Sequence, residues 1–329
     1  MDVLLLTEAE VGSLLSMPDV IGAVESALRE YAQGSAQMPA KTYLEFPKFE
    51  GDLRTMPAYL EKQNLSAVKI VTVNLENAAK FHLPTVRATI FLVDPQNGSV
   101  LSIMGGANIT AMRTGAAGGI AAKYLARKDS RVAGFIGAGV QARTQLAALL
   151  SVLPQIEEVR VWDLVPAASE KFVQDTKPEV GKRKVMKESE RADAVRDVDV
   201  LVTTTPSREP VVLNKWVSEG THINAIGADA PGKEELDPEI LKRSKIVVDN
   251  WEQASHSGEV NVPITKGILT RKDIWAELGD VIIGKRPGRT SDKEVTIFDS
   301  TGLAVQDVAS ANLVYKKALS QKVGHTVQM

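Results

Sequence analysis

The pattern with the clearest chemical meaning is a glycine turn, GAGVQA at residues 137–142, between a short apolar run and a helical pattern. Gly137 permits a tight turn after a strand, and Gly139 leaves backbone N–H groups open to a pyrophosphate. Ala142 allows the helix to pack closely on the strand. Anions bind at the N-terminus of such a helix. The pattern predicts a strand, turn and helix that bind a dinucleotide.

An acid ends the next β-rich run, VRVWD, where Asp163 lies 26 residues after Gly137. In dinucleotide-binding units a carboxylate about 20 residues after the first glycine binds the ribose hydroxyls. Because a carboxylate repels a 2′-phosphate, we expect NAD(H) rather than NADP(H). A glycine turn alone also joins unrelated strands and helices. The flanking strand, the helix and the terminal acid together favour the cofactor.

Polar residues also follow two later β-rich runs. Thr204 lies in VDVLVTTT, and Asn224 and Asp229 lie in HINAIGAD. A doubly wound sheet binds ligands outside the carboxyl ends of its strands. We therefore expect Thr204 to pack over the adenosine and Asn224 to reach the nicotinamide ribose. The alternatives are a β-forming threonine at a strand end and, for Asp229, an Asx-turn before Pro231-Gly232.

Composition argues against several other classes of function. The chain has 329 residues, of which 44% are hydrophobic, so roughly two domains with sizeable cores are expected. The net charge is −2 with both signs interspersed, so no nucleic-acid partner is expected. There is no cysteine for disulfides or thiol catalysis, and the four histidines lack the spacing of metal ligands, with His222 expected to be structural. The N-terminus MDVLLLTEAEV lacks a basic region and a long apolar run, which predicts a cytoplasmic protein without a membrane partner.

The elements that must position these residues predict one domain inserted into another. Helical periodicity over residues 7–31 gives way to short β-rich runs between Lys41 and Ile103, typical of a mixed or antiparallel sheet. From residue 114 onward, strands alternate with helices, the order of a parallel sheet. We expect an α/β fold in which residues 114–304 form a Rossmann-type doubly wound domain. It is inserted into an α+β substrate-binding and dimerisation domain of residues 1–113 and 305–329.

Motifs along the whole chain resemble the ornithine cyclodeaminase and mu-crystallin family: GDLRTMPAYL, SAVKIVTVN, HLPTVRA, MRTGAAGGIAAKYLARKDS, GFIGAGVQARTQL, DVLVTTTPSREPVV, GTHINAIGADAPGKEELD and VTIFDSTGLAVQD. The resemblance implies an NAD(P)-dependent enzyme acting on the α-carbon of an amino acid or on its imine, and a homodimer built through the non-nucleotide domain. By position, it implies that Arg54 and Arg113 bind the substrate carboxylate and that Lys69 and Asp229 form the acid–base pair. The residues implied to line the cofactor are Gly137, Gly139, Val140, Gln141, Asp163, Thr204, Asn224 and Ser300.

The residue types suit these implied roles. Arginine supplies the planar bidentate donor that a carboxylate needs, although Arg54 also fits a surface arginine with an acid nearby. Lys69 lies in the apolar run AVKIV, where the alternative is an exposed lysine on an edge strand. If Lys69 is desolvated beside Arg54, it loses its proton more easily and acts as a base. In the cyclodeaminases a threonine typically follows this lysine, and Ile70 in its place argues against ornithine as substrate.

The expected activity is the reversible, NAD-dependent oxidative deamination of an amino acid through an imine. L-alanine is the expected substrate because, within the family, the chain looks most like the alanine dehydrogenases. Lys69 and Asp229 are expected to relay protons to and from the attacking water and the departing ammonia. One alternative is a cyclic imine reductase (ketimine or pyrroline-2-carboxylate) or an ornithine cyclodeaminase. Another is a non-catalytic protein that binds NAD(P)H and a ligand, as mu-crystallin relatives can.

Overall fold

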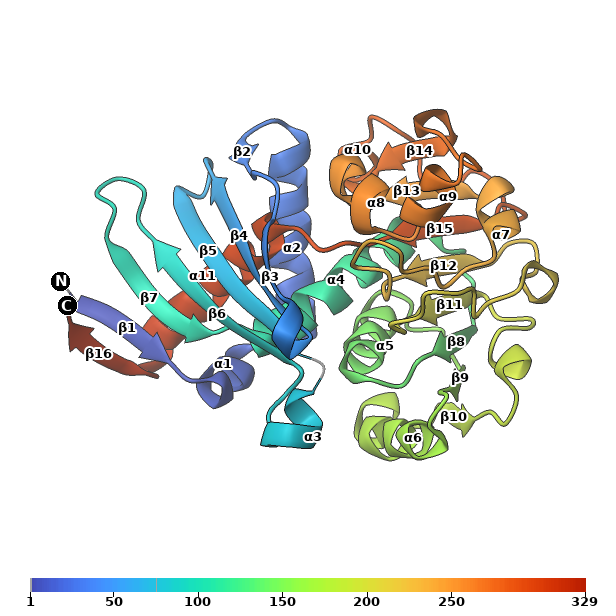
Figure 1. Cartoon of the computed structure of the whole chain (residues 1–329), viewed down its shortest axis with the longest axis horizontal. Helices are drawn as coiled ribbons and strands as arrows, with labels where there is room; N and C mark the ends of the chain where they lie inside the picture. Colours follow the sequence, from blue (N-terminus) through green and yellow to red (C-terminus); the bar gives the residue numbers. More distant parts are fainter. Residues whose placement is uncertain (1, 75) are drawn as a thin grey trace. The chain divides into compact units, whose positions relative to one another are not determined.

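The computed structural model describes residues 2–74 and 76–329 of the chain (Figure 1). One compact unit, unit 1, holds the chain up to Arg113 together with Leu303–Met329, and unit 2 is Thr114–Gly302. The return to unit 1 therefore lies two residues before the expected boundary. Helix α4 (Ala107–Leu125) contributes its first part to unit 1 and its remainder to unit 2.

Unit 1 is built on a mostly antiparallel sheet. Its strands run in the order β16-β1-β7-β6-β5-β4-β2, and β3 also pairs with β4. Only the pairing of β1 with β7 is parallel among those described. This confirms the mixed sheet expected from the β-rich runs, and strands from both ends of the chain extend it. The bounds are β1 (Asp2–Leu6), β2 (Ala36–Gln37), β3 (Thr42–Phe46), β4 (Gly51–Leu60), β5 (Leu65–Asn74), β6 (Val86–Val93), β7 (Val100–Gly105) and β16 (His325–Gln328).

Helices cover one face of this sheet. Helix α11 (Ala304–Gln321) packs on β4, β5 and β6 and against α2 (Met17–Ala32) (Figure 1). Side chains alternate between the two faces of a strand, and in β4 Met56 and Ala58 are buried while Pro57 between them is half-buried. Met56 lies opposite Lys69 of β5, so Lys69 is on the buried face. The remaining helices of this unit are α1 (Glu8–Leu14), α3 (Asn77–Phe81) and a 3₁₀ turn at Pro47–Phe49.

Unit 2 is a doubly wound parallel sheet in the order β10-β9-β8-β11-β12-β15-β13-β14. From β8 the chain moves outward through β9 and β10, then returns to the other side of β8 with β11 and β12. Ligands bind beyond the carboxyl ends of the strands where the order reverses. This confirms the predicted Rossmann-type fold. The bounds are β8 (Val132–Ile136), β9 (Glu158–Trp162), β10 (Lys184–Lys187), β11 (Val200–Thr203), β12 (His222–Ala225), β13 (Lys245–Val248), β14 (Ile274–Glu277) and β15 (Thr296–Asp299).

Helices and short turns connect the strands of unit 2. The central strands are buried along their whole length, as in β11 and β15, because helices flank parallel sheets on both faces. In the described part of the chain no single helix is long and apolar enough to span a membrane, and only α1 and α2, bent by 89° at their junction, reach those criteria as a pair. The helices are α5 (Val140–Val152), α6 (Pro166–Val180), α7 (Pro238–Lys242), α8 (Trp251–Ser257), α9 (Asn261–Thr265) and α10 (Leu278–Ile282), with 3₁₀ turns at Arg191–Ala194, Asn214–Trp216 and Arg271–Asp273.

Candidate functional site

The glycine turn joins β8 to α5. Gly137 has a φ of 97°, and a Cβ added there would lie 2.7 Å from Oγ1 of Thr204, so both the backbone and the packing require glycine. Gly139 is the N-cap of α5, and no described atom lies within 4 Å of the position its Cβ would take. The chain itself therefore leaves room at Gly139, which fits a ligand group bound at the N-terminus of α5. Gln141, in the first turn of this helix, is half-buried.

Asp163 follows β9 and is tied to the glycine turn. Its Oδ2 accepts a hydrogen bond from the N–H of Ala138 at 2.8 Å, and its Oδ1 accepts one from the N–H of Val165 at 2.8 Å. Each carboxylate oxygen has a second lone pair, so the acid can still bind ribose hydroxyls. Val140, the first residue of α5, is 66% exposed, and Leu164, directly after Asp163 in the chain, is 83% exposed. Apolar side chains in this position suit a flat ring.

Thr204 and Ser300 follow β11 and β15 at the carboxyl edge of the sheet. Oγ1 of Thr204 donates to the carbonyl oxygen of Gly137 at 3.3 Å, which brings the end of β11 against the glycine turn. Ser300 is 3% exposed, and its Oγ has no hydrogen-bond partner among the described residues. Buried hydroxyl groups normally have a partner. The Ser300 hydroxyl, like the space at Gly139, therefore fits a dinucleotide bound at this edge.

Asn224 is enclosed within unit 2. Its Nδ2 donates to the carbonyl oxygen of Gly118 at 3.1 Å and to Oε1 of Gln145 at 3.2 Å, and its Oδ1 lies 3.0 Å from Nε2 of His222. These bonds hold β12 to α4 and α5. That Asn224 reaches the nicotinamide ribose stays a prediction. Burial lowers the pKa of His222 to about 3, so this histidine is neutral, in agreement with its expected structural role.

Glu235 ties together the loops that follow β11 and β12. Its Oε1 accepts a hydrogen bond from the N–H of Thr205 at 2.6 Å, and its Oε2 accepts one from the N–H of Gly227 at 2.8 Å. Asp229 lies two residues after Gly227, is 41% exposed and pairs with Lys233. The loop that carries Asp229 is therefore anchored by a buried carboxylate that was not among the expected site residues.

Glu235 belongs to a chain of buried carboxylates linked through backbone N–H groups. Glu259 accepts a hydrogen bond from the N–H of Glu235, and Asp299, at the end of β15, accepts one from the N–H of Glu259, both at 2.9 Å. All three side chains are inaccessible to solvent. Burial raises the pKa of Glu235 and, together with the charge of Glu235, raises that of Glu259 well above its usual range. Burial also raises the pKa of Asp299 to about 8.

Lys69 lies in the interior of unit 1, so it is not an exposed edge lysine. It is 1% exposed, and its Nζ lies 2.9 Å and 2.8 Å from Oδ1 and Oδ2 of Asp307. Nζ also donates to Oγ1 of Thr110 at 3.3 Å. Burial, and next the charge of Arg113, lower the pKa of Lys69 to about 7, whereas Asp307 acts in the opposite direction. A lysine with this pKa exchanges a proton at neutral pH.

Arg113 shares the carboxylate with Lys69. Its Nε lies 3.1 Å from Oδ1 of Asp307, and its Nη1 donates to Oε1 of Gln306 at 3.2 Å. From the sequence we expected Arg54 to be the cation beside Lys69. This expectation is corrected, because the cation that lowers the pKa of Lys69 most is Arg113. Both arginines nonetheless belong to unit 1 with Lys69. The predicted substrate-binding arginines and the predicted base are thus contained in one unit.

Arg54 lies on the same face of the sheet as Lys69, two residues before Met56, which pairs with Lys69. Its guanidinium forms a bidentate pair with Asp52, with Nε to Oδ1 at 2.8 Å and Nη2 to Oδ2 at 2.9 Å. It also lies 5.4 Å from the centre of the Tyr43 ring. With 12% of its side chain exposed, Arg54 is not a surface arginine. These contacts hold the flat guanidinium in a fixed orientation.

Ile70 does not face this cluster. It follows Lys69 in β5, so it lies on the opposite, half-exposed face of the sheet. Its side chain therefore does not reach the group around Lys69 within this unit. The argument against ornithine from Ile70 rests on the family's sequence pattern and stays a prediction.

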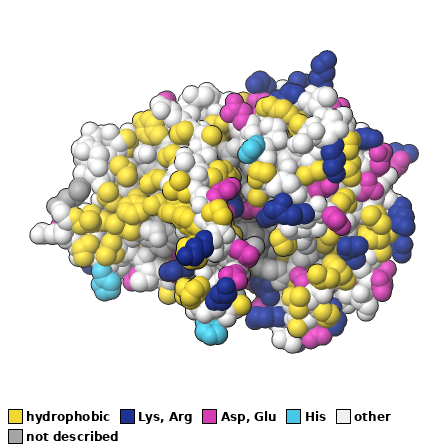
Figure 2. All heavy atoms as spheres, viewed as in Figure 1, with side chains coloured by type: hydrophobic (Ala, Val, Ile, Leu, Met, Phe, Trp, Pro, Cys, Tyr) yellow, Lys and Arg dark blue, Asp and Glu magenta, His cyan; other side chains and the backbone are white. Residues whose placement is uncertain are grey.

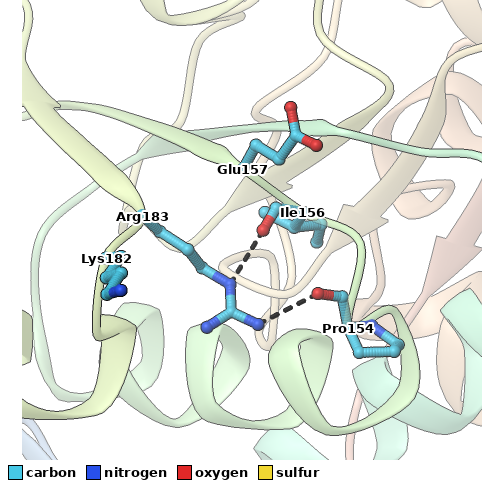
Figure 3. A pocket seen from close by; sticks show the side chains of 5 residues that line it. All are labelled: Pro154, Ile156, Glu157, Lys182 and Arg183. Atoms are coloured by element: carbon cyan, nitrogen blue, oxygen red, sulfur yellow. Dashed lines mark hydrogen bonds between the residues drawn. The ribbon is translucent and has the colours of Figure 1, made fainter.

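Two hollows of unit 2 lie at the edge of its sheet opposite to the one that binds ligands in this fold. In one, Arg183 donates to the carbonyl oxygens of Ile156 at 2.8 Å and Pro154 at 3.0 Å (Figure 3). This hollow has a volume of about 320 Å³, and the residues that line it come just before the first residues of β9 and β10 in the chain. Another, of about 510 Å³, adjoins the first residues of β13 and β14. Doubly wound sheets bind ligands at the carboxyl ends of their strands, so neither hollow is a candidate site.

Comparison with known proteins places these residues in a family. The chain matches the ornithine cyclodeaminase/mu-crystallin family over residues 1–322. It is 53% identical over 328 residues to the alanine dehydrogenase of Archaeoglobus fulgidus, covering 100% of this chain and 99% of that protein. Among solved structures, an archaeal alanine dehydrogenase dimer with bound NAD superimposes with a TM-score of 0.95, at 52% identity and full coverage of both chains.

A second solved structure is the Thermococcus litoralis Δ1-pyrroline-2-carboxylate reductase in complex with NADH and L-proline. It superimposes with a TM-score of 0.95 at 43% identity, covering 99% of this chain and 100% of that chain. Similarity along the entire length therefore extends to proteins named for two different reactions. On the match over nearly the whole sequence, the chain belongs to the ornithine cyclodeaminase/mu-crystallin family.

Proposed function

We propose that this protein is an NAD-dependent oxidoreductase that converts L-alanine, water and NAD⁺ to pyruvate, ammonium, NADH and a proton, reversibly. The observation that carries the proposal is the buried cluster of Lys69 and Arg113, which places a base with a pKa of about 7 next to a guanidinium. Oxidation of an amino acid needs a group that removes a proton from the substrate ammonium and a cation that holds its carboxylate. This cluster contains both kinds of group.

The residues at the carboxyl edge of unit 2 suit a dinucleotide. The N-terminus of α5 would take the pyrophosphate, Asp163 the ribose hydroxyls and Ser300 a further polar group. The open space at Gly139 and the unpartnered Ser300 hydroxyl support this assignment. When bound, NAD⁺ would supply the acceptor for the hydride that leaves the substrate α-carbon. Relatives solved with NAD or NADH bound support the same cofactor here.

The residues of unit 1 would handle the substrate. Arg54 and Arg113 bind its carboxylate, and neutral Lys69 removes a proton from the ammonium group, so the nitrogen lone pair can form the C=N bond as hydride leaves. Water then adds to the iminium carbon and gives up a proton to Asp229, and Lys69 passes its own proton to the departing nitrogen. Asp229 is proposed as a second acid–base group in this proton relay. The pKa of Lys69 supports these transfers because it lies near neutral pH.

A substrate screen separates the alternatives. NAD reduction is measured with L-alanine, L-ornithine and L-proline, and NADH oxidation with pyruvate plus ammonia and with Δ1-pyrroline-2-carboxylate. We expect the highest kcat/KM for alanine and for pyruvate plus ammonia. A preference for the cyclic imine would assign the reductase activity instead, a candidate that the likeness to the Thermococcus litoralis enzyme favours. Tight NADH binding without turnover of any pair would assign a ligand-binding protein.

The preference for NAD is tested at Asp163. Asp163→Ser combined with Leu164→Arg removes the charge that repels a 2′-phosphate and adds a cation that attracts it. We expect KM for NAD to rise and KM for NADP to fall, while Glu170→Ser, an exposed acid of α6, leaves both unchanged. Equal use of NAD and NADP by the parent enzyme would contradict the role of Asp163.

We also propose a homodimer formed through unit 1. Val68, Phe91 and Ile103 pair across β5, β6 and β7, and all three are half-buried. Figure 2 shows hydrophobic side chains gathered over this unit. Apolar surface of this kind is covered by a partner in many proteins, and an alanine dehydrogenase relative is solved as a dimer. The expected cytoplasmic location also stays a prediction.

Sedimentation analysis at micromolar concentration tests the dimer. The parent is expected to sediment as a dimer and Phe91→Glu as a monomer, because a buried unpaired charge is costly. Leu319→Glu is the matched control, since Leu319 is 54% exposed on α11, the helix on the other face of the sheet. A parent that sediments only as a monomer would rule the proposal out.

A further inference from the structure

Asp307 lies in the first turn of α11, 238 residues after Lys69 in the chain, and contacts both buried cations of unit 1. Its carboxylate lies 2.8 Å from Nζ of Lys69 and 3.1 Å from Nε of Arg113. The three side chains are 1%, 7% and 2% exposed for Lys69, Arg113 and Asp307, respectively. Water therefore does not screen these charges. One carboxylate balances two cations that would otherwise repel each other.

The contacts also fix the geometry of Arg113. Asp307 takes the Nε hydrogen, and the preceding residue, Gln306, accepts from Nη1 at 3.2 Å. Two contacts from one helical turn define the plane of the guanidinium. On the other side, Thr110 holds the Lys69 amine through a hydroxyl that itself donates to the carbonyl oxygen of Gly106 at 2.7 Å. The positions of both nitrogen groups are thus set by α4 and α11.

We propose that Asp307 is a positioning residue of the reaction, because its carboxylate orients the Lys69 amine as the proton acceptor and the Arg113 guanidinium as the carboxylate binder. The proposal rests on the proposed function, in which Lys69 and Arg113 have these roles. Asp307 does not itself bind the substrate in this account. A neutral residue in place of Asp307 removes the negative charge that both contacts share, so the charges of Lys69 and Arg113 are no longer balanced at this depth.

The charges around Lys69 determine the sign of the expected pH effect. Arg113 of α4 and Lys41, before β3, lower the pKa of Lys69, and Asp307 raises it. Asp307→Asn removes the negative charge that raises the pKa of Lys69, so this pKa is expected to fall below about 7. Neutral Lys69 is the active form in the oxidative direction. The acid limb of kcat/KM against pH is therefore expected to move to lower pH by about one unit, the scale for loss of an adjacent opposite charge.

The experiment compares Asp307→Asn, Asp307→Glu and Asp19→Asn in the full-length enzyme. We expect Asp307→Asn to lower kcat/KM on the pH plateau by about tenfold or more and to shift the acid limb. Asp307→Glu retains the negative charge. Its acid limb of kcat/KM against pH is therefore expected at the same pH as in the parent, even if its plateau value of kcat/KM is lower. Asp19→Asn is the matched control, because Asp19 pairs with Lys317 at 2.6 Å in the same unit at the surface. An Asp307→Asn enzyme with the parent's plateau and acid limb would overturn the proposal.

A double-mutant cycle separates this proposal from the proposed function. Urea unfolding is measured for the parent, Lys69→Met, Asp307→Asn and the double variant. Non-additivity between the two positions supports the orienting contact even if Lys69→Ala retains turnover, an outcome that would refute only the proposed role of Lys69. Additive effects would show that Asp307 does not hold Lys69. If Asp307→Asn does not fold, the cycle is carried out with Asp307→Glu.

Discussion

The two units each bury several charged side chains, and they satisfy those charges in different ways. In unit 2, Glu235, Glu259 and Asp299 accept hydrogen bonds mainly from backbone N–H groups at loop and strand ends. In unit 1, Lys69 and Arg113 contact the side chain of Asp307. Backbone N–H groups do not titrate, so the partners of these carboxyl groups keep the same charge at every pH, which suits the anchoring of loops. The pKa of a group that contacts other ionisable side chains depends on their charges, and such a pKa can be set to a value that suits proton transfer.

The largest effect is expected at Lys69. Lys69→Ala should lower kcat by roughly 10²-fold or more, the scale for losing a general acid or base, with little change in NADH binding, because the proposed cofactor residues belong to unit 2. Lys69→Arg should not restore turnover, because a guanidinium stays protonated at neutral pH. Steady-state kinetics and NADH fluorescence titration measure the two quantities. Turnover within a fewfold of the parent in either variant would make Asp229 the group to examine as the base.

A smaller effect is expected at Arg113. Arg113→Lys keeps a positive charge but loses the planar pair of donors, so KM for the amino acid should rise by roughly 10- to 100-fold, equivalent to about 1.5–3 kcal/mol of a hydrogen bond to a charged group. Arg29→Lys, at an exposed position of α2, is the control and should leave KM unchanged. An unchanged KM in Arg113→Lys would remove this arginine from the substrate-binding set.

Glu235 tests the anchoring role of the unit 2 carboxylates. Glu235→Ala leaves the N–H groups of Thr205 and Gly227 without their acceptor and should cost about 1–3 kcal/mol of unfolding free energy. Glu239→Ala, on the surface of α7, should change it by less than about 0.5 kcal/mol. Urea unfolding monitored by circular dichroism gives both values. Equal, small effects in the two variants would mean that the buried carboxylate is not an anchor.

The pH dependence of stability should have opposite signs in the two units. Asp299 has a pKa raised to about 8, so its contribution to stability is full below its ordinary value of 3.8 and is lost as the pH rises through about 8. Lys69 has a pKa lowered to about 7, so its contribution is full above 10.5 and is lost as the pH falls through about 7. Asp299→Asn should flatten the first slope and Lys69→Met the second. The same slope in the parent and in each variant would contradict these assignments.

Local patterns predicted much of the fold and part of the site. The glycine turn and Asp163 are close in the chain, and the structure joins them through the N–H of Ala138. Lys69 was recognisable as a charge in an apolar strand and through family resemblance. Asp307 was not recognisable as a site residue, because 238 residues separate it from Lys69 and only the packing of α11 on β5 brings the two side chains together.

Glu235 shows a second limit of sequence reasoning. It lies in a polar stretch, GKEELD, of a composition common in surface loops, yet it is fully buried. Its carboxylate oxygens accept hydrogen bonds from one N–H group of its own loop and one of the loop that follows β11. Asp299, in TIFDS, gave a clearer signal, since an acid that ends an apolar strand needs partners. Ile70 is a further position whose orientation residue type alone does not predict. Strand alternation places it on the opposite face from Lys69, which follows from register rather than from residue type.

The pH dependence of kcat/KM for amino-acid oxidation tests the central claim, that Lys69 is the group that accepts the proton. The account predicts an acid limb with an apparent pKa near 7 in the parent enzyme, corresponding to the pKa of Lys69. In Lys69→Ala the residual activity should lack this limb. Persistence of the same limb in Lys69→Ala would contradict the account, because the titrating group would then be one other than Lys69.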